Sequence, residues 1–205
     1  MLSRRHYEEF LVRLYFGDGK DYLELCIDRA YLDFNRTLHG IGKMPDAITV
    51  REHVSKMLNE ALVELRQIAQ IISDTRQFDQ WHKTTCESIV RAFCESGYHQ
   101  LHIGQAQKWL NMTLKYIYTM GDERIPGYLA FYGFCHVPLD NIIIRALSAY
   151  PDCPRLRCPW SRINDYGSYL NIQHWIRQRF ALPPLDVEFQ LWMGETVPPQ
   201  LEETL

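Results

Sequence analysis

Apolar residues recur at helical spacing along most of this chain, and the alternation typical of strands is rare. Helical periodicity predicts elements near residues 3–15, 21–38, 49–73, 79–94, 103–120, 138–150 and 165–180. Most of these stretches end close to a glycine or a proline, the residues at which helices usually stop. The pattern predicts an all-α fold: a compact multi-helix domain with no substantial sheet.

Local signals refine three of the boundaries. Thr49 and Glu52 have the spacing of a capping box, in which each side chain bonds a free backbone N–H, so a helix should begin there. Pro138 disfavours helical backbone before it and Asp140 is a good N-cap, so the next helix should open at Asp140. Residues 183–205 stay open, because alternation favours a strand whereas their two leading prolines fit the start of a short helix.

The chain of 205 residues suffices for a single domain, and no internal repeat or low-complexity tract divides it. We expect residues 1–97 to form a helical layer, residues 98–182 to hold the functional site, and residues 183–205 to form an acidic C-terminal segment. No apolar run reaches the roughly 18 residues that cross a bilayer. Six cysteines without a secretory signal are typical of reduced thiols, so we expect a cytoplasmic protein with no membrane partner.

Positive charge is concentrated in the second half of the chain. The net charge is −3, but residues 101–182 carry nine basic and five acidic side chains. Residues 183–205 carry five acidic side chains and no lysine or arginine, which hides this excess in the total. A local positive field permits a nucleic-acid partner without requiring one.

Lys108 and Asp140 are the pair of residues with the clearest chemical meaning. At about 100° per residue, Lys108 points roughly 200° away from Ala106 and off the apolar stripe of its helix, so its side chain should face water or a cleft. The dipole of the following helix should keep Asp140 ionised. A neutral lysine amine can attack a sugar carbon. A fixed carboxylate beside it can stabilise the charge that builds on the sugar as a glycosidic bond breaks.

Gly104, Lys108 and the Pro138-Leu139-Asp140 segment resemble the helix-hairpin-helix DNA glycosylase superfamily, most of all its archaeal 8-oxoguanine glycosylase branch. There, a glycine-containing hairpin leads into the helix that bears the lysine, and a Pro-x-Asp opens the following helix. The similarity covers about residues 100–150. It implies a helix-hairpin-helix-like element, a Schiff base at Lys108 and an electrostatic partner at Asp140. The expected activity is removal of a damaged or modified base, with or without lyase activity.

The chain departs from the pattern of this superfamily at two points. Only Gly104 stands where the hairpin usually has two glycines, and it lies four residues before the lysine. Cys135, Cys153 and Cys158 lack the spacing of the four-cysteine iron–sulfur cluster that many relatives carry, so we expect no metal and no cofactor. No phosphate-binding loop or dinucleotide fingerprint occurs in the sequence, which argues against a nucleotide cofactor.

The expected partner is double-stranded DNA whose target base flips into a pocket between the N-terminal helices and the 103–120 helix. Aromatic and amide side chains can stack on a base and bond its edge, and arginines can hold phosphates. The candidate DNA-binding residues are Gly104, Gln105, Gln107, Arg155, Arg157, Arg162 and Arg177. The candidate base-pocket residues are Trp109, Asn111, His136 and Trp160.

Each candidate also has a plainer interpretation. Lys108 would be a solvated helix lysine, and Asp140 an ordinary N-cap worth about 1 kcal/mol. Trp160 and Tyr169 would be core aromatics whose polar tips are bonded within the protein. The chain would then be a non-catalytic all-α module that binds nucleic acid or protein in a bacterial regulatory or defence locus.

Overall fold

The computed structural model describes residues 2–69 and 71–200, in which helices are the only regular elements. The α-helices are α1 (Arg4–Phe16), α2 (Tyr22–Phe34), α3 (Ala47–Gln67), α4 (Thr75–Glu95), α5 (Ile103–Met120), α6 (Asn141–Leu147), α7 (Tyr166–Arg179) and α8 (Pro184–Trp192). The 3-10 helices are η1 (Asn35–Thr37), η2 (Ile41–Lys43), η3 (Leu129–Phe134) and η4 (Trp160–Arg162). No strand occurs in the described residues, so the all-α prediction is confirmed.

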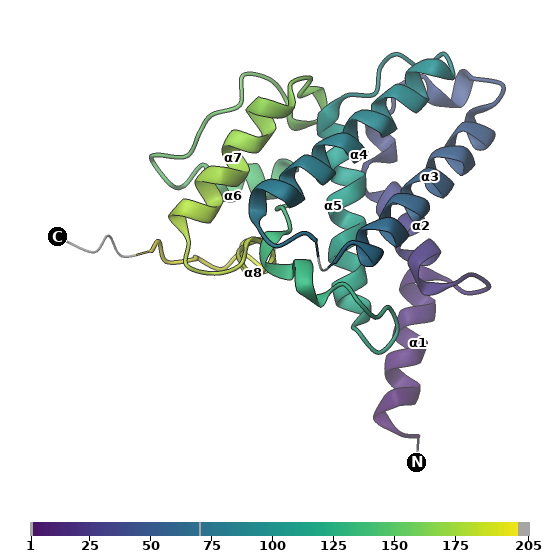
Figure 1. The fold of residues 1–205 in the computed structure, drawn as a ribbon, viewed down its shortest axis with the longest axis horizontal. Helices are drawn as coiled ribbons and strands as arrows, with labels where there is room; N and C mark the ends of the chain where they lie inside the picture. The colour runs from purple at the N-terminus through teal and green to yellow at the C-terminus, as the bar shows by residue number, and fades with distance from the viewer. Residues whose placement is uncertain (1, 70, 201–205) are drawn as a thin grey trace.

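Two groups of helices lie on either side of α5, which runs through the middle of the molecule (Figure 1). The N-terminal group consists of α2, α3 and α4, and both α2 and α4 pack against α5. The C-terminal group consists of α6, α7 and α8, and α5 contacts α7 together with η4. α1 projects from this body and buries none of its residues. None of the described helices is long and apolar enough to cross a lipid bilayer.

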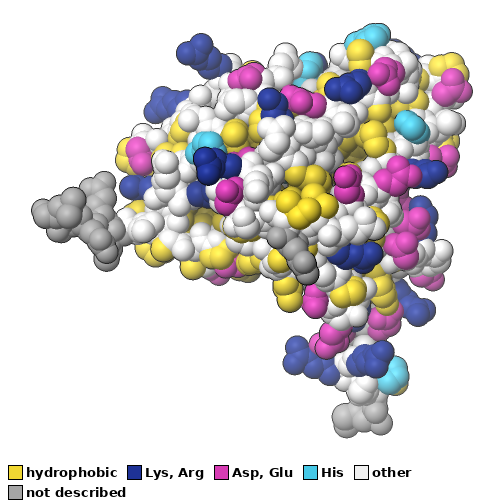
Figure 2. Space-filling view, viewed as in Figure 1, with side chains coloured by type: hydrophobic (Ala, Val, Ile, Leu, Met, Phe, Trp, Pro, Cys, Tyr) yellow, Lys and Arg dark blue, Asp and Glu magenta, His cyan; other side chains and the backbone are white. Residues whose placement is uncertain are grey.

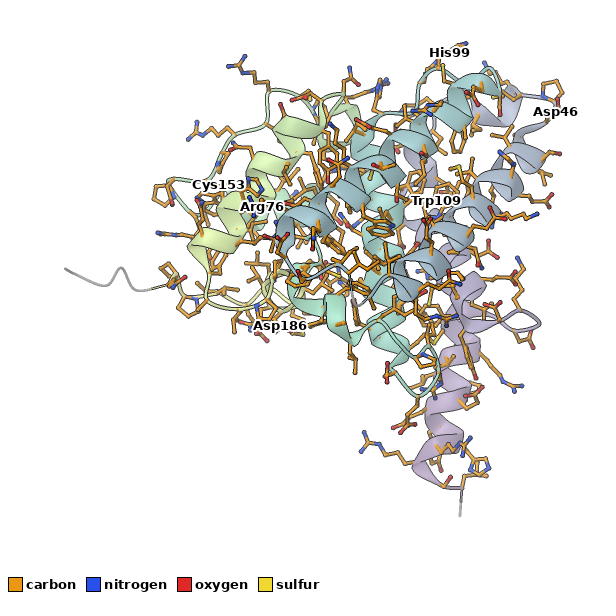
Figure 3. The ribbon with its side chains drawn as sticks, in the orientation of Figure 1. Asp46, Arg76, His99, Trp109, Cys153 and Asp186 are labelled. Atoms are coloured by element: carbon orange, nitrogen blue, oxygen red, sulfur yellow. The ribbon has the colours of Figure 1, made fainter. Side chains whose placement is uncertain are left out.

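α5 is covered on all sides: of its 18 residues, only Tyr118 and Thr119 are not buried. Its apolar side packs against α2 and α4. There the Trp109 ring lies 5.1 Å from Tyr31 and 5.6 Å from Phe34, and its Nε1 donates to the Ile27 carbonyl at 3.0 Å. Figure 3 shows Trp109 in the interior of the helical body. Burial of aromatic rings of this size accounts for much of the stability of this half.

The opposite side of α5 carries a polar stripe that is equally buried. Its members recur at helical spacing and are Gly104, Gln107, Lys108, Asn111 and Lys115. Buried polar groups destabilise a fold unless they find partners, so the C-terminal group must supply acceptors and donors to this stripe. The stripe therefore determines how α6, α7 and α8 are placed.

Two predicted helix starts differ from the structure, and the structure decides the alternative left open for residues 183–205. α3 begins at Ala47, so Thr49 lies inside the helix and the capping box at Thr49 is wrong. α4 begins at Thr75, because the Asp74 carboxylate accepts from the Gln77 N–H and caps the helix earlier than expected. In the C-terminal segment the helical alternative is correct, and proline stands at the first position of α8.

We expect Gly104→Ala to destabilise the protein. A Cβ atom at this position would lie 1.7 Å from the carbonyl oxygen of Trp160, which is backbone and cannot rotate away. Overpacking of this kind costs about 1–3 kcal/mol, and urea unfolding at 25 °C measures it. Gly42→Ala is the control, because a Cβ there meets nothing within 4 Å. Equal stability of the two variants would contradict the close packing of α5 against η4.

Candidate active site

The buried segment Cys135–Leu139 leads from η3 to Asp140 without regular secondary structure, so its backbone needs partners from elsewhere. Gln173 accepts from the Val137 N–H and donates to the Val137 carbonyl, both at 2.9 Å. Gln107 accepts from the Leu139 N–H at 3.2 Å and donates to the Leu139 carbonyl at 3.0 Å. These two side-chain amides take the place of a neighbouring strand, and they fix the position of Asp140.

Lys108 and Asp140 meet at the end of this segment. The Lys108 Nζ donates to Asp140 Oδ2 at 2.7 Å, so the two groups lie within a sugar's width of each other. The second oxygen, Oδ1, caps α6 by accepting from the backbone N–H groups of Ile142 and Ile143, each at 2.9 Å. The carboxylate is thereby held by the helix N-terminus and aimed at the amine.

The exposure of the pair differs from the prediction for Lys108. The Lys108 side chain is 5% exposed and that of Asp140 is 18% exposed. Of the two expected surroundings of Lys108, water or a cleft, water is wrong, because the C-terminal helices cover the polar stripe of α5. The accessible edge of the pair is the Asp140 side, next to exposed Asn141 and Ile142.

A second ion pair lies seven residues further along α5. Lys115 Nζ is 2.5 Å from a carboxylate oxygen of Glu188 in α8, and the ammonium also lies over the Phe189 ring at 4.5 Å. Burial raises the pKa of Glu188, while the nearby cations Lys115 and Lys108 counteract that rise. The two ion pairs thus influence each other across the buried interface between α5, α6 and α8.

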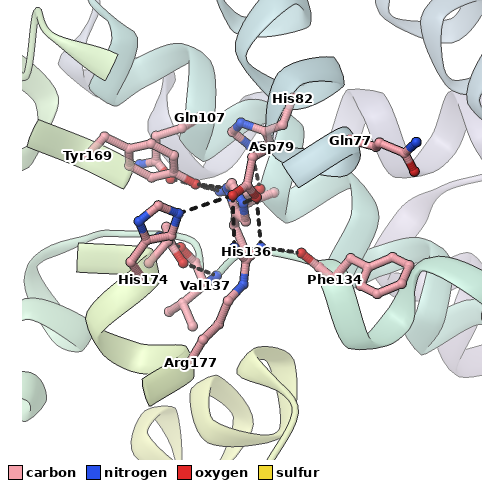
Figure 4. Close-up of polar contacts among 12 residues, drawn as sticks. Gln77, Asp79, His82, Gln107, Phe134, His136, Val137, Tyr169, His174 and Arg177 are labelled. Atoms are coloured by element: carbon pink, nitrogen blue, oxygen red, sulfur yellow. Dashed lines mark hydrogen bonds and ion pairs between the residues drawn. The ribbon is translucent and has the colours of Figure 1, made fainter. Parts of the chain in front are cut away.

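Asp79 of α4 joins the two helical groups through a buried network (Figure 4). The Arg177 guanidinium donates twice to Asp79, at 3.0 and 2.9 Å, and His136 Nε2 lies 2.7 Å from the same carboxylate. On its other side, His136 Nδ1 lies 2.8 Å from the Tyr169 hydroxyl. Asn111 donates to that hydroxyl at 2.8 Å, which connects the network to α5.

The pKa shifts of the residues in this network indicate which of them are protonated at pH 7. Burial lowers the pKa of His136 to about 4, although its hydrogen bond to Asp79 works in the opposite direction. His136 is therefore neutral at pH 7, with Nε2–H donating to Asp79 and Nδ1 accepting from the Tyr169 hydroxyl. Burial also lowers the pKa of His82, whose Nε2 donates to the Asn111 side-chain oxygen at 2.9 Å. The hydrogen bonds to His136 and Arg177 hold the pKa of Asp79 well below its usual range despite its burial.

Several predicted DNA contacts are buried in the protein instead. Gly104 lies inside α5 against η4, and the described residues do not place it in a hairpin turn. Gln105 donates to the carbonyl and hydroxyl oxygens of Thr37. The Gln107 side-chain amide is hydrogen-bonded to Leu139 and Asn111. Arg177 is bound to Asp79. In this arrangement these four residues are packed against or hydrogen-bonded to other parts of the protein and not turned toward DNA.

Arg155, Arg157 and Arg162 are exposed, as binding to phosphates would require. They belong to the loop and 3-10 helix that precede α7. Figure 1 places the loop before α7 at the upper left of the molecule. Several Lys and Arg side chains lie on that part of the surface (Figure 2).

The predicted base pocket is not formed by its expected residues. Trp109, Asn111 and His136 are each enclosed by protein and bonded to it, so the plainer interpretation holds for them. Trp160 alone lines a cavity, of about 360 Å³, together with residues of α6 and of the segment 150–159. Among the described residues, no three His, Cys, Asp or Glu side chains converge as metal ligands do.

The sequence interpretation missed Asp79, His82, Lys115 and Glu188. No local signal pointed to them, because a polar stripe opposite an apolar one is also the pattern of a helix with one face in water. Which residues cover the polar stripe depends on contacts between distant segments.

Comparisons of this chain with protein-family models, with curated proteins and with solved structures found no match.

The two buried histidines should make stability depend on pH. In the unfolded chain both titrate near 6.5, so the unfolded state binds more protons than the native state between pH 6.5 and 4, by up to about two. The free energy of unfolding should therefore fall as pH falls through this range. His82→Gln should reduce the slope by up to about 1.4 kcal/mol per pH unit. Urea titrations at several pH values measure this, with exposed His53→Gln as control. An unchanged slope in His82→Gln would contradict a neutral buried His82.

Proposed function

We propose that this protein is a DNA glycosylase with lyase activity, in which Lys108 is the nucleophile and Asp140 its partner. The observation that carries the proposal is the 2.7 Å contact between the Lys108 amine and a carboxylate fixed at a helix N-terminus, across 32 residues of sequence. The resemblance of the Gly104–Lys108 and Pro138–Asp140 segments to helix-hairpin-helix glycosylases supports the same reading. The substrate is duplex DNA with a damaged or modified base.

The proposed chemistry uses both groups of the pair. Asp140 accepts a proton from the Lys108 ammonium and leaves a neutral amine. The amine forms a bond to C1′ of the sugar while the bond from C1′ to the base breaks. The base leaves with the electron pair and takes up the proton that Asp140 had accepted, which returns Asp140 to its carboxylate form. Loss of a proton from Nζ and opening of the sugar ring, with O4′ protonated, then give a Schiff base. The caps on Oδ1 keep the carboxylate in place throughout.

Access to the pair is from the N-terminal end of α6. The Asp140 side chain is the more exposed of the two, and it is flanked by exposed residues. A sugar would approach there, and the Lys108 side chain would turn outward past Asp140 to meet it. The basic loop before α7 would hold the phosphates of the strand on which that sugar lies.

A non-catalytic binding module is the second candidate. It is favoured by the near-complete burial of Lys108, since a buried ion pair also serves to specify how helices dock. Both candidates use the same exposed arginines, so only a test of covalent chemistry separates them.

Borohydride trapping on duplex DNA with an abasic site tests the nucleophile. We expect wild type to form a covalent adduct and Lys108→Arg to lose it by at least about 100-fold, because arginine keeps the ion pair but stays protonated. Lys115→Arg is the matched control, since Lys115 is also a buried, paired lysine of α5. It should trap within a few-fold of wild type. The absence of a wild-type adduct, or its persistence in Lys108→Arg, would favour the binding module.

Duplex binding should depend on salt through the exposed arginines. Each phosphate contact contributes a slope of about −0.9 in log K against log salt. A variant with Arg155, Arg157 and Arg162 changed to Gln should bind more weakly and lose about two to three units of slope in fluorescence anisotropy. Lys56→Gln is the control, because Lys56 is an exposed residue of α3. Wild-type binding that does not change with salt would indicate a partner other than DNA.

A further inference from the structure

A cavity of about 360 Å³ lies between α6, the segment 150–159 and α7, on the surface of the C-terminal group. One wall is the face of α6 formed by Asn141, Ile144 and Ser148, and Trp160 and Ile172 lie on other sides. Cys153, which also lines it, lies near α7 in Figure 3. The volume is at the lower end of the range for small-molecule sites, which suits one flat ring system rather than a length of polymer.

Two residues that line this cavity are neighbours of the proposed active-site pair, although Lys108 and Asp140 are not themselves part of its lining. Asn141 in its wall directly follows Asp140. Trp160 in its wall touches α5 at Gly104, one helical turn before Lys108. The cavity is therefore lined by α6, at whose N-terminus Asp140 lies, and by Trp160, which packs against the helix that carries Lys108.

The chemistry of the lining suits an aromatic ring attached to an anion. Most of the lining residues are apolar, and they include Tyr150 and Trp160, whose side-chain type can pack against a flat base. Arg155 lies at the cavity and is exposed, whereas Arg177 and Arg179 nearby are paired with carboxylates. By contrast, a larger cavity between α2 and α3 is lined by charges of both signs, such as Lys20, Glu24 and Arg51, and offers no apolar wall of this kind.

We propose that this cavity receives the extrahelical base of the substrate, with Arg155 holding a phosphate next to it. This inference rests on the proposed glycosylase function and specifies where its substrate binds. It replaces the pocket between the N-terminal helices and α5, whose expected residues are buried. The base would reach the cavity from the α6 N-terminus, so its sugar would remain beside Asp140.

The test separates the base pocket from the nucleophile by using two substrates. Ser148→Trp places an indole in the cavity. We expect it to slow single-turnover base release from duplexes carrying 8-oxoguanine, uracil or hypoxanthine by at least about 50-fold. Trapping on abasic DNA, which has no base to accommodate, should stay within about threefold of wild type. Ser96→Trp is the matched control, because Ser96 is likewise the exposed C-cap of a helix, α4, and bonds a backbone carbonyl.

A cross-link provides a readout that does not need catalysis. Duplexes carrying an adenine with a thioethyl tether, activated as a mixed disulfide, should exchange with Cys153 or Cys158 in the cavity and release the small thiol. The adduct should disappear in the Cys153→Ser, Cys158→Ser double variant and in Ser148→Trp. Exposed Cys94, on α4, serves as the reference for non-specific exchange.

The outcomes distinguish this inference from the function on which it rests. A wild-type protein that neither releases a base nor traps abasic DNA would overturn both. Wild-type trapping with unimpaired base release in Ser148→Trp would overturn the pocket alone. So would a tethered base that reacts no faster with the two cavity cysteines than with Cys94. Loss of trapping and release together in a folded Ser148→Trp would place the cavity at the nucleophile and not at the base.

Discussion

The pairing of two glutamine side chains with the backbone of the 136–139 segment is the interaction on which the rest of the C-terminal half depends. Gln107 comes from α5 and Gln173 from α7, and each satisfies both backbone groups of one residue of the segment. If a buried backbone N–H or C=O group lacked such a partner, the protein would lose about 1–3 kcal/mol of stability for each unsatisfied group. The segment can therefore lie only where both amides reach it, and that places Asp140 and the start of α6.

The polar stripe of α5 extends the same constraint along the helix. Gln107, Lys108, Asn111 and Lys115 each have a partner in the C-terminal group, and no solvent is available to substitute for a missing one. Removing one member of a buried pair typically costs about 3–5 kcal/mol, whereas replacing both by apolar groups is often neutral. The main effect of such a stripe is therefore to specify one docking arrangement of α6, α7 and α8, while its net contribution to stability is small. The network around Asp79 does the same for α4 and α7.

The same hydrogen bonds restrict the position of the Asp140 carboxylate. A carboxylate held by two backbone N–H groups and by a segment that is itself held at two points has little freedom to move. Preorganised groups of this kind stabilise developing charge without reorganising. The amine is held in place by the same carboxylate, and the cavity lined by the next residue, Asn141, is also lined by exposed Arg155.

The sequence by itself determined the helical fold and most element boundaries, because these follow from local periodicity, caps and breakers. It also determined that Asp140 begins a helix and that the 103–120 helix bears Lys108, since both are local properties. The contact between them was a prediction from a resemblance, and the structure placed them 2.7 Å apart. Only the tertiary structure decided that Lys108, Gln105 and Gln107 are buried, that Arg177 binds Asp79, and that the cavity lies by Trp160. Periodicity describes which residues share a face of a helix, but whether water or another helix covers that face depends on contacts between segments far apart in the chain.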